Sequence, residues 1–148
     1  MKEQLLEHQI YRQGCYMLDR FLIADEGVIL SEARLIKNDN NPIFYHLASL
    51  ETNNNFRQRG LATKILRQVN LFLEQNHILG ILENQMLRNN PSHEIYKKNG
   101  WQESEKYSNW MFYNKAQDMG NQEIYNVIEF LINEKIADDF DFPEIRIK

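Results

Sequence analysis

The pattern of apolar and polar positions predicts strands in the first third of the chain. Apolar and β-branched residues cluster in three stretches, at 21–24, 28–36 and 43–52. The polar segments between them, 25–27 and 38–42, contain Asp, Asn, Gly and Pro, which favour turns. We therefore predict three strands that follow one another as a β-meander.

A helical pattern begins at Leu61. Apolar residues then recur every three or four positions as far as Leu73, with charged and amide side chains between them. This spacing predicts a helix that ends near Asn76 and His77. The next stretch, 78–83, is short and mostly apolar, so we predict a buried strand there.

A second, shorter helix is predicted after residue 90. Asn90 is suited to cap the free amides of a helix, and Pro91 fits the first helical position. Gly100 can take the left-handed conformation that often ends a helix, so the helix is expected to close at Asn99 and Gly100. Segments 101–103 and 110–113 are then candidate strands of a hairpin.

The last part of the chain predicts one more helix. Between residues 121 and 136 the apolar residues have helical spacing, which indicates an amphipathic helix of about four turns. Residues 138–143 are acidic with two aromatics, and form either an ordered arm or a partner-binding segment. Strands and helices in this order predict a layered fold of the α/β (α+β) class.

Composition places the chain among globular proteins of one domain. It has 148 residues, of which 43% are hydrophobic and 26% charged. No apolar run reaches the roughly 18 residues of a membrane span, and the first residues lack a signal-peptide pattern. We expect a cytoplasmic protein without a membrane partner.

Charge and cysteine content exclude further classes. The formal net charge of −4 argues against binding to a nucleic-acid backbone, which needs clustered Lys and Arg. The single cysteine, Cys15, forms no internal disulfide and supports no zinc framework, so no metal is expected. Because no neighbour would lower its pKa, a buried or half-buried thiol is favoured over a nucleophile.

The polar loop before the first helix has the features of an anion site. The first N–H groups of a helix have no partner inside the helix and lie at the positive end of its dipole. Gly60 and Ala62 would let a phosphate approach the backbone closely. Arg57 and Arg59 could add charge-assisted hydrogen bonds.

Two segments resemble motifs of one family. Arg57-Gln58-Arg59-Gly60-Leu61-Ala62 resembles the pyrophosphate loop of the GNAT acetyltransferases, Gln/Arg-x-x-Gly-x-Gly/Ala, and Phe56 fills the aromatic position before it. Segment 89–101 is similar to the later motif of the family, Asn-x-x-Ala-x-x-x-Tyr-Glu-Lys-x-Gly-Phe. Ser92 stands for its small residue and Trp101 for its aromatic one. The direct matches are Asn89, Tyr96, Lys98 and Gly100.

The resemblance covers roughly residues 21–113 and implies both a fold and a reaction. The fold would be a mixed, mostly antiparallel central sheet flanked by helices. The reaction would be acetyl transfer from acetyl-CoA to a primary amine of a small molecule or protein, by direct attack in a ternary complex. The residues implied for the cofactor are Leu50, Thr52, Arg57, Gln58, Arg59, Gly60, Leu61, Ala62, Thr63, Asn89 and Tyr96.

Three residues are candidates for catalysis. Tyr96 would lie near the sulfur and protonate or hydrogen-bond the leaving thiolate, or it is a packed aromatic of the helix. His46 is either a base that deprotonates the amine or a half-buried structural histidine. Glu51 is the alternative base. His77 and His93 are expected to be exposed.

The sequence departs from the family at both ends. About twenty residues precede residue 21, where the family usually has a first strand and two helices, so the N-terminal part is shortened. We expect a GNAT-like domain at 1–116 and an extra C-terminal helix with an acidic tail at 117–148. That helix packs on the same domain, replacing the missing wall of the acceptor cleft, or mediates a homodimer. The alternative function is a noncatalytic module that binds CoA or a protein.

Overall fold

The computed structural model describes residues 6–53, 55, 60–84, 92–115 and 118–134. Their strands are β1 (Leu6–Gln13), β2 (Tyr16–Asp25), β3 (Val28–Asn38), β4 (Asn41–Thr52), β5 (Leu79–Glu83), β6 (Gln102–Glu103) and β7 (Trp110–Tyr113). Their helices are α1 (Leu61–Gln75), α2 (Ser92–Lys98) and α3 (Asn121–Glu134).

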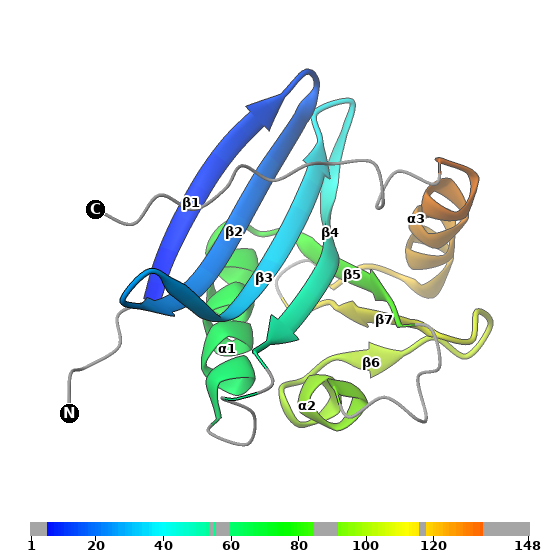
Figure 1. Cartoon of the computed structure of the whole chain (residues 1–148). Helices are drawn as coiled ribbons and strands as arrows, with labels where there is room; N and C mark the ends of the chain where they lie inside the picture. The colour runs from blue at the N-terminus through cyan, green and yellow to red at the C-terminus, as the bar shows by residue number, and fades with distance from the viewer. Residues whose placement is uncertain (1–5, 54, 56–59, 85–91, 116–117, 135–148) are drawn as a thin grey trace.

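All seven strands form one mixed sheet. Its order is β1-β2-β3-β4-β5-β7-β6, and β4 and β5 are its parallel pair (Figure 1). Strands β1 to β4 are joined by short turns and pair antiparallel, whereas α1 carries the chain from β4 to β5. Such a connection is needed because parallel neighbours cannot be joined by a tight hairpin.

Helix α1 covers one face of the sheet, behind β1–β4 in Figure 1. Its apolar stripe packs against inward-facing residues of β2, β3 and β4, because side chains alternate between the two faces along each strand. Tyr96 and Trp101 extend this core beneath β5 and β7. The residues contributed by α1 are Leu61, Ile65, Leu66, Val69 and Leu73.

Helix α3 packs on the opposite face. Ile124, Val127, Ile128 and Leu131 meet the alternate residues of β4, β5 and β7. Those strand residues are Phe44, Leu79, Ile81, Trp110 and Phe112. The parallel pair at the centre of the sheet is therefore covered on both sides.

A buried asparagine fixes the end of α2 to α1. Asn70 is 7% exposed, and its Nδ2 donates to the carbonyl oxygen of Asn99 at 2.9 Å. Trp101 Nε1 donates to Asn70 Oδ1 at 2.9 Å, and the backbone N–H of Trp101 donates to the carbonyl oxygen of Tyr96 at 3.0 Å. The position of Tyr96 is thus linked to the middle of α1.

The structure confirms the predicted fold class and the predicted helices and strands. β2, β3 and β4 contain the three predicted strands, and Gly100 has a positive φ of 90° at the end of α2, as expected. The capping positions Asn90 and Pro91 lie outside the described residues, as do the acidic tail and residues 116–117, so the domain boundary stays a prediction.

The N-terminal region contains a strand that the sequence analysis missed. β1 passes directly into β2 through Gly14 and Cys15, with no helix between the two strands. Cys15 is exposed at this turn, so the prediction of a buried or half-buried thiol was wrong. A tight hairpin leaves its central residues outside the sheet.

Candidate active site

The site begins where the two parallel strands separate. β4 and β5 pair at Phe44 with Leu79, at Tyr45 with Gly80 and at His46 with Ile81. Both strands continue beyond this point, β4 to Thr52 and β5 to Glu83, but no further pair joins them among the described residues. The backbone groups on this edge of β4 therefore lack a partner strand.

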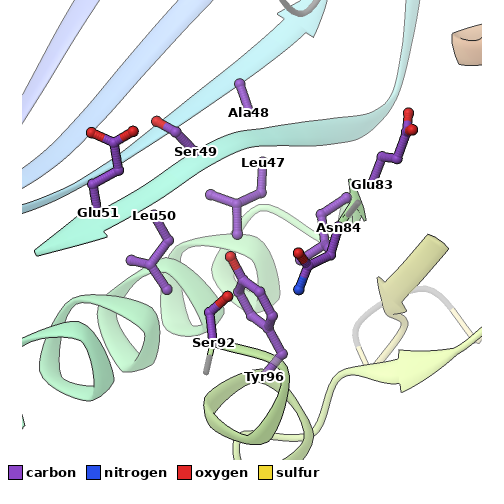
Figure 2. Close-up of a pocket in the computed structure, with 10 residues that line it drawn as sticks. Leu47, Ala48, Ser49, Leu50, Glu51, Glu83, Asn84, Ser92 and Tyr96 are labelled. Atoms are coloured by element: carbon purple, nitrogen blue, oxygen red, sulfur yellow. The ribbon is translucent and has the colours of Figure 1, made fainter. Parts of the chain in front are cut away.

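A β-bulge in β4 lies beside the opening. Arg34 of β3 pairs with Ser49, but the next residue, Leu35, pairs with Leu47, so Ala48 is an extra residue. Because of this insertion Leu47 and Leu50, three positions apart, both pack in the core on the α1 face. Ser49 and Glu51 consequently point to the other face (Figure 2).

A pocket of about 220 Å³ lies between the separated strands. Figure 2 shows Leu47 and Leu50 pointing from β4 toward Tyr96, with Ser92 beside Tyr96. The volume is small for a whole cofactor and comparable to that of a reacting group. Its lining residues are Leu47, Ala48, Ser49, Leu50, Glu51, Leu82, Glu83, Asn84, Ser92 and Tyr96.

Tyr96 contributes its phenol side chain to this pocket. It projects from α2 and is only 6% exposed. Burial raises the pKa of Tyr96 well above its ordinary value, and a hydrogen bond with Ser92 acts in the opposite direction. Tyr96 thus holds its proton at neutral pH, as an acid must, and it also packs in the core as the alternative interpretation required.

Gly60 is the N-cap residue of α1. It has φ 75°, a left-handed conformation that favours glycine, and it has no side chain that could cap the first amides of the helix. Among the described residues, a Cβ built on Gly60 would meet nothing within 4 Å, which leaves room for a ligand to approach the backbone there. Leu61 is buried, whereas Ala62 and Thr63 are half-buried in the first turn. The predicted cofactor residues Arg57, Gln58, Arg59 and Asn89 lie outside the described residues.

The two candidate bases have different surroundings. Glu51 lines the pocket and is exposed. His46 is 8% exposed and does not belong to the lining; it lies on the α3 face, with its ring centroid 6.3 Å from that of Trp110. The pocket therefore brings together Leu50, Glu51 and Tyr96 but not His46.

Two further predictions are answered by side-chain contacts. Thr52 does not line the pocket; its Oγ1 is 2.9 Å from Ser31 Oγ, across the pair β3 and β4. His93 was expected to be exposed, but it is 9% exposed and hydrogen-bonded to Glu103 of β6. The helical pattern alone could not show that β6 lies against this face of α2. His77 is exposed, as predicted.

The sequence analysis missed most of the pocket wall. Ser92 was noted only as the small residue of a motif, and Asn84 was not assigned to the site. The residues that it did not assign are Leu47, Ala48, Ser49, Leu82 and Glu83. Alternation along β4 could have indicated Leu47, but the bulge at Ala48 leaves no clear signal in the sequence.

The described residues hold no cluster of three or more His, Cys, Asp or Glu that could bind a metal ion. Within the same residues, no helix is long and apolar enough to cross a membrane.

Comparison with protein families decides the classification. Residues 2–101 match the model of the acetyltransferase (GNAT) family, which is more than half of the chain. The chain belongs to the GNAT acetyltransferase family. The resemblance to this family is thereby confirmed. A search of curated proteins found no match.

Solved GNAT structures share the fold at low sequence identity. The ribosomal-protein-S18-alanine N-acetyltransferase from Escherichia coli has a TM-score of 0.55 and 15% identity, with 74% of each chain covered. An acetyltransferase of the GNAT family from Staphylococcus aureus has a TM-score of 0.52 and 16% identity, covering 65% of this chain and 66% of that one. A GNAT N-acetyltransferase from Escherichia coli in complex with CoA has a TM-score of 0.51 and 11% identity, covering 64% and 57%.

The chain spans only part of several GNAT relatives. It covers less than two thirds of the Staphylococcus protein and of the CoA complex, and 31% of a tandem GNAT protein from the clavulanic acid biosynthesis pathway. At identities of 11–16%, this structural likeness shows the shared fold alone. The activity and acceptor of the present protein have to be argued from its own pocket.

Proposed function

We propose that this protein is an acetyl-CoA-dependent N-acetyltransferase that acts on a primary amine. The observation that carries the proposal is the separation of β4 from β5 around a pocket that contains Tyr96. The unpaired edge of β4 can hydrogen-bond the amide groups of an extended ligand such as the pantetheine arm. Membership in a family whose model describes acetyltransferases supports the same reaction.

The diphosphate of the cofactor would bind at the start of α1. The first-turn amides, which have no partner inside the helix, and the positive end of the helix dipole favour an anion at Gly60, Leu61, Ala62 and Thr63. Arg57, Gln58, Arg59 and Asn89 remain assigned to the cofactor by the motifs. Leu50, next to the core of α1, would contact the arm between the phosphates and the thioester.

The two faces of β4 suggest how the reaction runs. The amine nitrogen attacks the thioester carbonyl carbon, the C–S bond breaks, and an amide and a thiolate form. Tyr96, on the α1 face, would give its proton to the sulfur. Glu51, whose side chain points to the other face (Figure 2), would accept the proton lost by the amine. His46 is the weaker candidate because it does not line the pocket.

Calorimetry with acetyl-CoA tests the cofactor site. Replacing Gly60 by Asp puts a carboxylate against the proposed diphosphate and a side chain on a backbone with positive φ. We expect Gly60→Asp to abolish binding, whereas Gly27→Asp, at a β2–β3 turn with the same sign of φ, should leave it unchanged. Equal binding by both variants would contradict the site.

Thiol release tests the reaction. With a panel of small amines and N-terminal peptides, the unmodified protein should release CoA, and Tyr96→Phe should lose at least about 100-fold in kcat. Calorimetric binding of acetyl-CoA by that variant controls for its folding. Binding without turnover on any acceptor would support instead the noncatalytic CoA-binding module.

A further inference from the structure

Ser92 lies next to the phenol of the pocket. Ser92 and Tyr96 are four positions apart on α2, so their side chains lie on the same side of the helix. Both line the pocket, where Ser92 lies beside Tyr96 (Figure 2), and the Ser92 hydroxyl is a hydrogen-bond partner of the phenol. Neither the family match nor the motif assigns a role to this serine.

The direction of that hydrogen bond matters for catalysis. A phenol has one proton and can donate it to only one acceptor at a time. If Tyr96 donates to Ser92, its proton points away from a leaving group. If Ser92 donates to Tyr96 Oη, the phenol proton is free to point into the pocket, and the developing phenolate keeps a donor.

The surroundings make this donor valuable. The side chains of β4 and β5 that face Tyr96 include those of Leu47, Leu50 and Leu82, which offer no hydrogen bond to a phenolate. Burial therefore opposes ionisation of Tyr96, and the Ser92 hydroxyl counteracts it. A thiolate is a weaker base than a phenolate, so proton transfer from Tyr96 is uphill without such help.

We propose that Ser92 is a positioning residue of the transfer reaction: its hydroxyl donates to Tyr96 Oη and directs the phenol proton toward the leaving sulfur. This role rests on the proposed function. In the step itself the O–H bond of Tyr96 breaks, an S–H bond forms on CoA, and Ser92 keeps its own proton. Solvent returns the proton to Tyr96 after the product leaves.

A double-mutant cycle separates this role from a structural one. In Ser92→Ala, kcat should fall about 10-fold, since a hydrogen bond to a developing charge is lost, while the Kd of acetyl-CoA changes little. In the Tyr96→Phe background the same substitution should change kcat by less than about 2-fold, because the residue through which it acts is already gone. Ser92→Thr, which keeps the hydroxyl, should restore most of the activity.

Matched measurements keep the outcomes distinct. Ser108→Ala, at an exposed serine between β6 and β7, is the control and should be fully active. The role of Ser92 is overturned if Ser92→Ala lowers kcat equally in the unmodified and Tyr96→Phe backgrounds, or if it does not lower kcat in the protein that keeps Tyr96. Either result leaves the proposed function intact. Absence of transfer by the unmodified protein overturns the proposed function and this role with it.

Discussion

Replacing Asn70 by Ala tests how α1 holds the loop that follows α2. The substitution removes both the amide that donates to the Asn99 carbonyl and the oxygen that accepts from the Trp101 indole, each at 2.9 Å. Trp101 is 2% exposed, so its N–H has no ready access to water. The variant therefore leaves the buried Trp101 N–H and the half-buried Asn99 carbonyl oxygen without their Asn70 partners.

The expected cost follows from these two groups. An unsatisfied buried polar group costs about 1–3 kcal/mol, so Asn70→Ala should lower the free energy of unfolding by about 2–5 kcal/mol. For a chain of this size that corresponds to a fall of roughly 5–15 °C in Tm. Tyr96 should also be less well held, because the N–H of Trp101 donates to its carbonyl.

Urea unfolding followed by tryptophan fluorescence and circular dichroism measures this cost. Asn76→Ala is the matched control, since Asn76 caps the same helix but is exposed, and it should cost less than about 1 kcal/mol. In a Trp101→Phe background, which lacks the indole donor, the Asn70→Ala penalty should shrink by about 1 kcal/mol or more. A penalty that is small, or equal in both backgrounds, would refute the reasoning.

Two further predictions concern packing and pH. A Cβ at Gly80 would lie 2.6 Å from Leu73 Cδ1 and 2.8 Å from Trp101 Cη2, so Gly80→Ala should destabilise the fold by about 1–3 kcal/mol in thermal and urea unfolding. In the control variant Gly120→Ala the nearest neighbour of the new Cβ is at 3.9 Å, so this substitution should be close to neutral. Equal losses of stability in the two variants would contradict overpacking at Gly80. Burial, with the nearby Glu74 carboxylate, raises the pKa of Tyr113 to about 12, above the roughly 10 of an unfolded tyrosine. The folded state therefore holds this proton to a higher pH than the unfolded state does. The resulting contribution of Tyr113 to the free energy of unfolding is complete below about pH 10 and is lost as pH rises to about 12. Between pH 10 and about 12 the urea midpoint of Tyr113→Phe should fall less steeply with pH than that of the unmodified protein. The same pH dependence in both proteins would contradict the raised pKa of Tyr113.

Elements with strong periodicity could be predicted from the sequence. The stripe of α1 and the apolar stretches of β2–β4 satisfy local rules that depend on one face being buried. β1 could not be found in this way. Its burial pattern is mixed, with Ile10 60% exposed and a polar His8 stacked on Phe21, so its strand structure depends on pairing with β2 rather than on its own composition.

The site was predicted in part for a similar reason. Motif spacing indicated Tyr96 and Gly60 because each stands at a helix position with a defined geometry. Leu82 and Glu83 become pocket residues only because β5 departs from β4, which is a property of two distant segments. The placement of His46 likewise depends on which face of β4 it occupies, and that face is covered by α3.

The extra residue at Ala48 sets the phase of the strand that follows it. If the same residues ran as a regular strand with no bulge, strict alternation would exchange the faces of Ser49 to Thr52, so that Leu50 would leave the core and Glu51 would enter it. Deleting one residue at the bulge would keep these faces, whereas inserting one more would exchange them. Length changes at this point are therefore unlike those in a surface turn. Libraries built on this scaffold therefore have to keep the pairing of Ser49 with Arg34, because that register decides which side chains face the core.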